Sequence, residues 1–191
     1  IQMPLELLPG TTSVHVLSVR NECKELLFVV EREADGREPL VRCINFGLDG
    51  MQSFSFTLEE ERSAVLVPAG QVGTYLYEPN ASVLKAGAFK QIAVRTGVKK
   101  LQVNSHLYTS DHLVSDFPGR RFRVDEVLSF TGKLCKGLSK TIPQANITVR
   151  NFPLSVEELR KRTKITDGGH VYLFATTLVD GEKVLVKCSK A

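Results

Sequence analysis

The last third of the chain carries alternating strand and helix signals that leave few possible folds. Apolar and β-branched stretches predict strands at residues 122–130, 147–152, 171–177 and 184–188. Thr131 is a suitable N-cap for a helix of about two turns, and the capping box Ser155-Val156-Glu157-Glu158 opens a second helix that runs to about Lys164. Asp180-Gly181 is a typical two-residue hairpin turn. The order strand, helix, strand, helix, strand, strand predicts an α+β domain.

The first 70 residues have the pattern of a β-rich domain. Strands are predicted where apolar residues cluster or alternate with polar ones, at residues 14–19, 26–30, 40–46 and 53–57. Turns are predicted at residues 21–24, at Asp35-Gly36 and at residues 47–50. The chain begins with Ile1. The apolar residues Leu5 and Leu7 are typical of the end of a secondary-structure element that begins earlier in a longer sequence. We therefore expect the chain to be a fragment of a longer protein.

Residues 71–116 are predicted to connect these two regions. Tyr75-Leu76-Tyr77 indicates a short strand, and Asn80 is a good N-cap for the helix that follows. Apolar residues continue at helical spacing towards Gly97, a typical C-terminal stop. We expect one helix between Asn80 and Gly97.

Charge is distributed unevenly along the chain. Residues 1–70 contain six Lys/Arg and 11 Asp/Glu, for a net charge of −5. Residues 71–191 contain 19 Lys/Arg and 10 Asp/Glu, for a net charge of +9, which gives the overall +4. A basic part of this kind is a candidate surface for a polyanion.

Three lysines give the clearest pattern in the basic part. Lys133, Lys136 and Lys140 are spaced i, i+3, i+7, so they form one stripe opposite the apolar face of their helix. Lys and Arg side chains neutralise phosphates without reading base sequence. A solvated helix face explains any single lysine equally well, but the whole set favours contact with nucleic acid. The residues predicted to contact RNA are Arg120, Arg121, Arg123, Lys133, Lys136, Lys140, Arg150, Arg160, Lys161 and Lys164.

The sequence contains no recognisable catalytic motif. It has no G-x-G triplet for a cofactor-binding turn, no Pro-Pro pair, no phosphate loop and no H-E-x-x-H zinc motif. His106 lies near Ser105 and Asp111, but a triad is defined by geometry, and a hydrogen-bonded polar loop is the simpler interpretation. The four cysteines form no C-x-x-C pair, so they are predicted to be reduced, mostly buried thiols rather than metal ligands.

Targeting signals are also missing from the sequence. No apolar run approaches the ~18 residues of a membrane-spanning helix. No basic, apolar and small-residue pattern of a secretory signal opens the chain. We expect a cytoplasmic protein.

Several motifs resemble those of a known family. They are the stretches at residues 19–27 (VRNECKELL), 77–80 (YEPN), 85–89 (KAGAF), 104–110 (NSHLYTS) and 149–154 (VRNFPL). Together they resemble bacterial class I S-adenosylmethionine-dependent methyltransferases with a C-terminal THUMP-like domain. The resemblance extends over essentially the whole chain.

The resemblance implies a domain order and a function. In that family a catalytic Rossmann-type domain comes first, followed by a ferredoxin-like domain and a THUMP-like domain. The implied fold is α+β, with two small domains: a β-rich ferredoxin-like domain at 1–70, a connecting helical segment at 71–116 and a THUMP-like α+β domain at 117–191. Domains of the THUMP class help RNA-modifying enzymes to position tRNA, so the implied partners are structured RNA and the missing methyltransferase domain. S-adenosylmethionine would be held by that missing domain, and no catalytic residue of the family can be assigned to this chain.

Two other functions remain open at this point. The basic surface could dock a protein or the methyltransferase domain without contacting RNA. A small enzyme of another kind would instead require a concave site with titratable groups of perturbed pKa.

Overall fold

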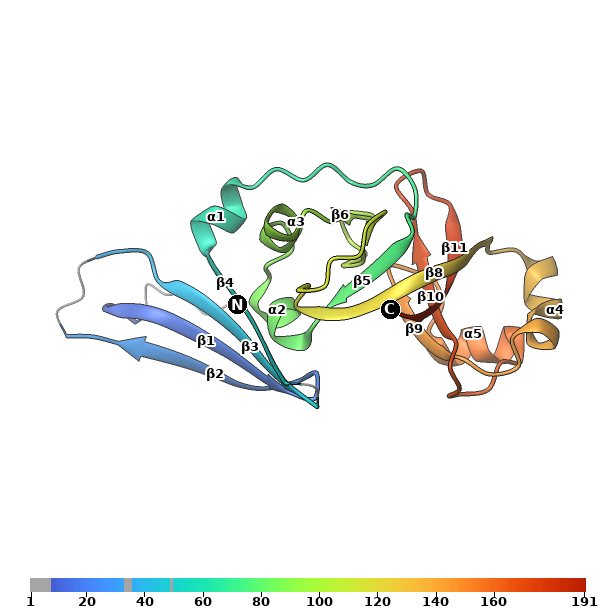
Figure 1. The fold of residues 1–191 in the computed structure, drawn as a ribbon, viewed down its shortest axis with the longest axis horizontal. Helices are drawn as coiled ribbons and strands as arrows, with labels where there is room; N and C mark the ends of the chain where they lie inside the picture. Colours follow the sequence, from blue (N-terminus) through green and yellow to red (C-terminus); the bar gives the residue numbers. More distant parts are fainter. Residues whose placement is uncertain (1–7, 33–35, 49) are drawn as a thin grey trace. The chain divides into compact units, whose positions relative to one another are not determined.

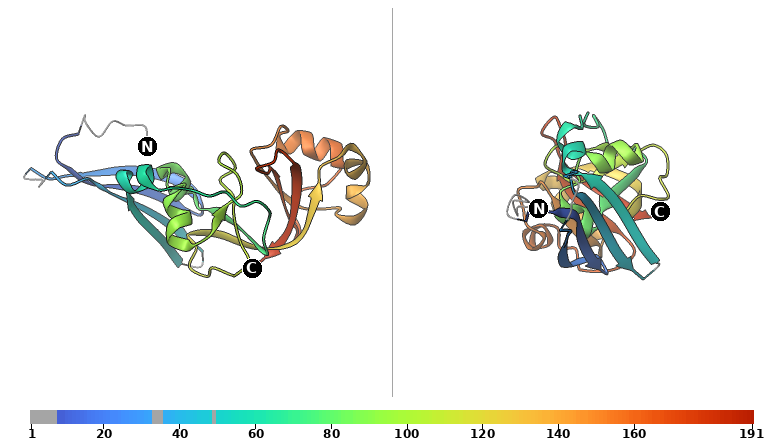
Figure 2. Two further views of the ribbon diagram at one scale, coloured as in Figure 1. Left: turned by 90° about the horizontal axis from the view of Figure 1, so that it is seen from above. Right: turned by 90° about the vertical axis from the view of Figure 1, so that its left-hand side faces the viewer.

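The computed structural model describes residues 8–32, 36–48 and 50–191 (Figures 1 and 2). Contacts divide the chain into two compact units, each built from segments that are separate in the sequence. Unit 1 comprises Ile1–Leu66, Pro79–Gly97 and Asp116–Arg120, and unit 2 comprises Val67–Glu78, Val98–Ser115 and Arg121–Ala191. Leu5, Leu7, Asp35 and the chain start at Ile1 lie outside the described residues.

Unit 1 contains a four-stranded sheet of order β2-β1-β3-β4. Its strands are β1 (Thr11–Val19), β2 (Glu22–Val30), β3 (Leu40–Gly47) and β4 (Gly50–Thr57), so all four predicted strands are confirmed. The two hairpins β1–β2 and β3–β4 are antiparallel, and β1 and β3 pair in parallel at the centre of the sheet (Figure 1).

The first turn differs from its prediction at residues 21–24. Arg20 and Asn21 both have positive φ, at 50° and 62°, and they form the two-residue connection between β1 and β2. Such a turn matches the twist of the flanking strands, and asparagine tolerates the left-handed region well. As a result Cys23 and Lys24 belong to β2 instead of the turn.

Three short helices complete unit 1, where the sequence predicted one. Helix α1 (Leu58–Ser63) begins with an unpredicted capping box formed by Thr57 and Glu60. The helix predicted between Asn80 and Gly97 is divided into α2 (Ala81–Ala86) and α3 (Gln91–Thr96). Gly87 ends α2 in the left-handed conformation with φ of 82°, and Gly97 ends α3 as predicted.

Asn80 joins the segments of unit 1. Its side-chain oxygen accepts hydrogen bonds from the Val83 N–H at 3.1 Å and the Ser82 hydroxyl at 2.7 Å, which confirms its role as N-cap. Its amide nitrogen donates to Gln52 Oε1 at 3.1 Å, and its backbone N–H donates to the Pro118 carbonyl at 3.0 Å. Asn80 is 2% exposed, so these bonds form away from water.

The polar network continues from Gln52 into the sheet. Gln52 donates to the Gly119 carbonyl at 3.1 Å and accepts from Asn45 Nδ2 at 3.4 Å. The buried Ser18 hydroxyl donates to Asn45 Oδ1 at 2.7 Å, and the Asn21 side chain accepts from the first backbone N–H of α2 at 2.8 Å. Two of the quoted family-like motifs, at 19–27 and 77–80, therefore meet through hydrogen bonds.

Unit 2 is organised around a seven-stranded sheet of order β6-β7-β5-β8-β11-β10-β9. Its strands are β5 (Tyr75–Pro79), β6 (Lys99–Lys100), β7 (Tyr108–Ser110), β8 (Gly119–Ser129), β9 (Asn146–Arg150), β10 (Tyr172–Thr177) and β11 (Lys183–Lys190). Helices α4 (Gly132–Thr141) and α5 (Val156–Thr163) lie between β8 and β9 and between β9 and β10. The predicted order from β8 to β11 is thus confirmed, and the described chain is an α+β protein.

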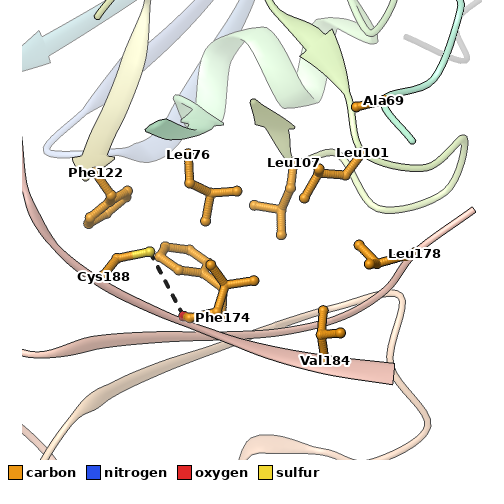
Figure 3. Close-up of a cluster of buried hydrophobic side chains, with 10 residues drawn as sticks. Ala69, Leu76, Leu101, Leu107, Phe122, Phe174, Leu178, Val184 and Cys188 are labelled. Carbon is orange, nitrogen blue, oxygen red and sulfur yellow. Dashed lines mark hydrogen bonds between the residues drawn. The ribbon is translucent and has the colours of Figure 1, made fainter. Parts of the chain in front are cut away.

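Opposite faces of this sheet bury two separate apolar cores. One gathers side chains from β5, β8, β10 and β11 and from the segment around β6 and β7; Figure 3 shows Phe122, Phe174, Leu76 and Leu107 converging there. The other lies beneath α4 and α5 and includes Leu138, Leu159, Ile142, Leu173 and Leu185. The second core fixes the two basic helices against β8–β11.

All four cysteines are free thiols, as predicted, and Cys43, Cys135 and Cys188 are buried. Burial raises the pKa of Cys43 and of Cys188 to about 12, so both remain protonated and unreactive at neutral pH. No helix in the described part of the chain is long and apolar enough to cross a membrane.

Replacing Asn80 should destabilise unit 1. Asn80→Ala removes an N-cap, worth about 0.5–2 kcal/mol, and leaves buried partners such as Ser82 without an acceptor, at about 1–3 kcal/mol. We expect a loss of about 2–4 kcal/mol in the free energy of unfolding, measured by urea denaturation. Asn80→Asp keeps the acceptor and should lose less, and the exposed Asn104→Ala should change stability by less than ~0.5 kcal/mol. Equal stability of N80A and N104A would contradict this role.

Candidate nucleic-acid interface

Helix α4 presents the predicted lysine stripe to solvent. The Thr131 hydroxyl caps the helix by accepting the Leu134 N–H at 3.1 Å, and Cys135 and Leu138 are buried beneath it. Lys133, Lys136 and Lys140 are all exposed. At a rise of ~1.5 Å per residue, the stripe is about 10 Å long.

The charge of this stripe is not compensated within the helix. Helix α4 contains no acidic residue, and none of the three lysines forms an ion pair with a described residue. Lys133 lies in the first turn, where the helix dipole disfavours a positive charge by a few tenths of a kcal/mol. Helix stability therefore does not explain a lysine at position 133.

The end of α5 supplies a second group of positive charges. Its capping box is present as predicted, with Glu158 accepting from the Ser155 N–H at 2.8 Å. Lys161, Arg162 and Lys164 at the other end are exposed. Here the arrangement of acidic first turn and basic last turn matches the helix dipole, so part of this charge stabilises the helix itself.

The two helices pack against each other, which brings their charges together (Figure 1). Burial raises the pKa of the Cys135 thiol on α4, and the positive charge of Arg162 on α5 partly opposes that shift. We call the six exposed side chains of this pair the α4–α5 basic surface: Lys133, Lys136, Lys140, Lys161, Arg162 and Lys164. The predicted contact set omits Arg162, although its position in the last turn beside Lys161 was a signal for it.

Arg160, by contrast, is used within the fold. Its guanidinium forms an ion pair with Asp167 and donates to the carbonyls of Ala145 and Ile165, each at 3.3 Å. Only 22% of its side chain is exposed. This arginine holds the end of α5 to the segments around it.

The predicted arginines of β8 lie apart from the α4–α5 basic surface. Arg120, Arg121 and Arg123 occupy the beginning of β8, whereas α4 follows its end. Eight residues separate Arg121 from Ser129, which corresponds to about 26 Å of extended chain. Arg121 donates to the Ser115 carbonyl, while Arg120 and Arg123 are exposed.

Arg150 is engaged in a buried ion pair. Its Nη2 and Nε donate to Oε1 of Glu78 at 2.8 and 3.2 Å. Glu78 is 2% exposed, and a buried carboxylate requires a partner of this kind. The charge of Arg150 is therefore largely balanced by Glu78.

A partly buried histidine lies in the same region of unit 2. Burial, together with the positive charges of Lys100 and Arg150, lowers the pKa of His106 to about 4. Lys100 is itself 3% exposed and donates to the Val103 carbonyl at 2.6 Å. Ser105 donates to the Gln102 carbonyl at 3.1 Å, so the polar loop around His106 is hydrogen-bonded to its own backbone.

The turns that follow the parallel strands do not fit a methyl-donor cofactor. A helix-opening turn that holds a nucleotide-like cofactor needs glycine, because the backbone must approach the ligand closely. β1 and β3 each lead into a hairpin, and β9 leads into α5 through Asn151–Ser155, which contains no glycine. Among the residues that the structure describes, no group of His, Cys, Asp or Glu is arranged to hold a metal ion.

Two domain families match the part of the chain just described. Residues 75–118 match the model of a ferredoxin-like domain, and residues 119–190 match the model of a THUMP domain-like family. The second match contains β8–β11 and both basic helices. Residues 119–190 form a THUMP-like domain.

A solved structure is similar over nearly the whole chain. The crystal structure of a putative methyltransferase from Porphyromonas gingivalis W83 is 42% identical and superposes with a TM-score of 0.85. The match covers 95% of this chain and 46% of that one, so this chain spans less than half of that protein's length. No curated protein matches this chain.

The THUMP-like match begins two residues after the predicted boundary at 117. The ferredoxin-like match lies at 75–118, a region predicted as a connecting segment, and not at 1–70. β5, α2, α3, β6 and β7 all fall within it.

The low pKa of His106 makes stability depend on pH. An unfolded histidine has a pKa near 6.5, so between about pH 6.5 and pH 4 the unfolded chain binds a proton that the folded chain does not. Stability should therefore fall as the pH falls through this window, by on the order of 1–3 kcal/mol. His106→Asn, which tolerates the φ of 50° at this position, should flatten the dependence in urea denaturation at a series of pH values. The exposed His170→Gln serves as the control, and an unchanged slope in H106N would contradict the assignment.

Proposed function

We propose that this chain is the RNA-binding accessory region of an S-adenosylmethionine-dependent RNA methyltransferase. Its THUMP-like domain would hold the phosphates of structured RNA, such as tRNA, on the α4–α5 basic surface. The observation that carries this proposal is a lysine stripe without acidic partners in its helix, on a domain that matches the THUMP domain-like family. The resemblance described above associates domains of the THUMP class with RNA-modifying enzymes.

Charge supports phosphate binding by this domain. Residues 119–190 contain 14 Lys/Arg and seven Asp/Glu, for a net charge of +7. Several of these charges are balanced in the fold, such as Arg150 by Glu78 and Arg160 by Asp167. The remaining exposed lysines and arginines can release counterions from RNA, which gives affinity that depends on salt and little on sequence.

Recognition by shape suits this surface. Folded RNA presents phosphates and 2′-hydroxyls in a wide minor groove, which proteins contact without reading bases. Two aromatic side chains of unit 2 are poorly placed to stack on bases: Tyr108 is fully buried, and Phe152 is partly buried against the second core, with its ring centroid 5.0 Å from that of Phe130. Phosphate contact is therefore the mode that the exposed side chains support.

Methyl transfer is assigned to another part of a longer protein. The described turns that follow β1 and β9 contain no glycine, and the similar Porphyromonas protein is more than twice as long as the match. In this proposal the chain contributes substrate positioning, and the cofactor and catalytic groups lie in the remaining part. A role for the basic surface in docking that part without RNA is the alternative that the following measurement separates.

RNA binding should depend on salt and on the lysine stripe. We expect total bacterial tRNA to bind the chain with an affinity that falls steeply between 50 and 200 mM salt. The triple variant Lys133→Ala, Lys136→Ala, Lys140→Ala should bind more weakly, and the slope of log K against log salt should decrease by about 2–3, since each phosphate contact contributes about 0.7–0.9.

A matched control removes the same charge elsewhere. The exposed lysines of the triple variant Lys85→Ala, Lys99→Ala, Lys190→Ala lie outside both helices, so its slope should stay close to that of the unmodified chain. An equal decrease in both variants would show non-specific attraction to net charge. Absence of binding at low salt would refute the proposal and favour the docking role.

A further inference from the structure

In the described part of the chain, the sheet of unit 1 has one face covered by helix α2 and an opposite face with several exposed apolar side chains. Val14, Val16, Val41 and Cys43 point to the covered face, where α2 packs against β1, β2 and β3, and each is at most 1% exposed. Side chains alternate along a strand, and partners in register share a face. The other side chains of the same strands therefore form the opposite surface, which we call the open face.

Large apolar side chains form a cluster on the open face, next to polar ones such as Arg42 and Ser53. Leu17 lies opposite Ile44 and Val19 opposite Phe46, and Phe46 in turn lies opposite Met51 on β4. Their exposed fractions are high for such side chains: 41% for Val19, 46% for Phe46 and 63% for Met51. Leu27 and Val29 on β2, opposite His15 and Ser13, extend the same surface.

The distribution of apolar residues on β2 differs from that of a strand with one solvent-exposed face. A half-solvated antiparallel sheet alternates apolar residues inside with polar residues outside. Strand β2 instead contains five consecutive apolar residues, Leu26-Leu27-Phe28-Val29-Val30, three of which are exposed. Continuous apolar runs of this kind are typical of strands that are buried on both faces.

We propose that the open face is an intramolecular interface, covered by an apolar helical layer from a further part of the same protein. Two observations identify this occupant. The apolar run of β2 and the cluster around Phe46 and Met51 form a surface that a second layer of helices can bury, and the similar Porphyromonas protein has more than half of its length outside the match. The inference rests on the part of the proposed function that places this chain in a longer protein, and it is independent of RNA binding.

Oxidation of Met51 tests the inference without any substitution. Hydrogen peroxide converts an accessible thioether to a sulfoxide, with release of water. In the 191-residue chain Met51 should oxidise at a rate close to that of free methionine, because it is 63% exposed. In the protein expressed from its complete reading frame the rate should be at least tenfold lower, measured by peptide mass spectrometry. Equal rates in the two proteins, or a reading frame that encodes no further domain, would overturn the proposal.

A pair of substitutions gives an independent measurement. Phe46→Glu with Met51→Lys places a neutral charge pair on the open face, between partners in register. The 191-residue chain should keep its melting temperature within about 2 °C and bind less of a dye for apolar surface, whereas the complete protein should melt at least 5 °C lower. Met51→Lys alone is the milder variant if the pair prevents folding. Val94→Glu, at a 56% exposed position on α3, is the control that should have no effect in either protein.

A second copy of this chain is the other candidate to cover the open face, and light scattering distinguishes it. A second copy of the chain on the open face would make the 191-residue chain dimeric by light scattering, and the Phe46→Glu, Met51→Lys pair would dissociate the dimer. That result would overturn the intramolecular interface. A failure to bind tRNA, in contrast, would refute only the RNA-binding proposal. The intramolecular interface is tested separately, so the two failures are distinguishable.

Discussion

The buried amide of Asn80 is the interaction on which the architecture of unit 1 depends. This unit is assembled from three segments that are distant in sequence, and covalent connection alone does not bring them together. Asn80 caps α2, reaches Gln52 on β4 and binds the Pro118 carbonyl through its backbone, so one residue contacts all three segments. In a low-dielectric interior such a network is favourable only when its members are satisfied together, which makes it specific for a single arrangement. The family-like motifs at 19–27 and 77–80 are explained by this network without assigning them a catalytic role.

Positive charge in unit 2 serves two different purposes, and the structure separates them. Arg150 pairs with the buried carboxylate of Glu78, and Arg160 pairs with Asp167 and donates to the carbonyls of Ala145 and Ile165. Among the described residues the lysines of α4 have no such partners; Lys140 lies in the last turn, where the helix dipole favours it, but Lys133 opposes the dipole and Lys136 is outside both end turns. A side chain that contributes nothing to its helix and is not balanced nearby is the kind that remains available for a ligand. This distinction, more than the net charge of the domain, supports the choice of the α4–α5 basic surface.

Local signals predicted the THUMP-like domain well. Thr131, the Ser155–Glu158 box and Asp180-Gly181 each fix an element boundary through a few neighbouring residues, and such boundaries can be read from sequence. The division of the helix at Gly87 was missed because an isolated glycine within a helical pattern can be tolerated without ending the helix. The pairing of Arg150 with Glu78 could not be predicted, since 72 residues separate the two and only the tertiary fold brings them together. For the same reason, the sequence could not show that Arg150 and Arg160 form ion pairs within the fold.

The open face and the basic surface differ in the kind of partner that each can hold. An apolar sheet face gains free energy by excluding water over a large, complementary area, which suits a permanent partner within the same polypeptide. A lysine stripe binds phosphates through long-range attraction that salt weakens, which suits a substrate that must be released after each reaction. The two proposals, a permanent contact on unit 1 and a reversible one on the THUMP-like domain, are compatible with each other: an accessory region of this kind would stay attached to an enzyme while its RNA exchanges. The chemistry of the two surfaces is therefore consistent with one function, in which this chain carries the substrate-holding part of a larger catalyst.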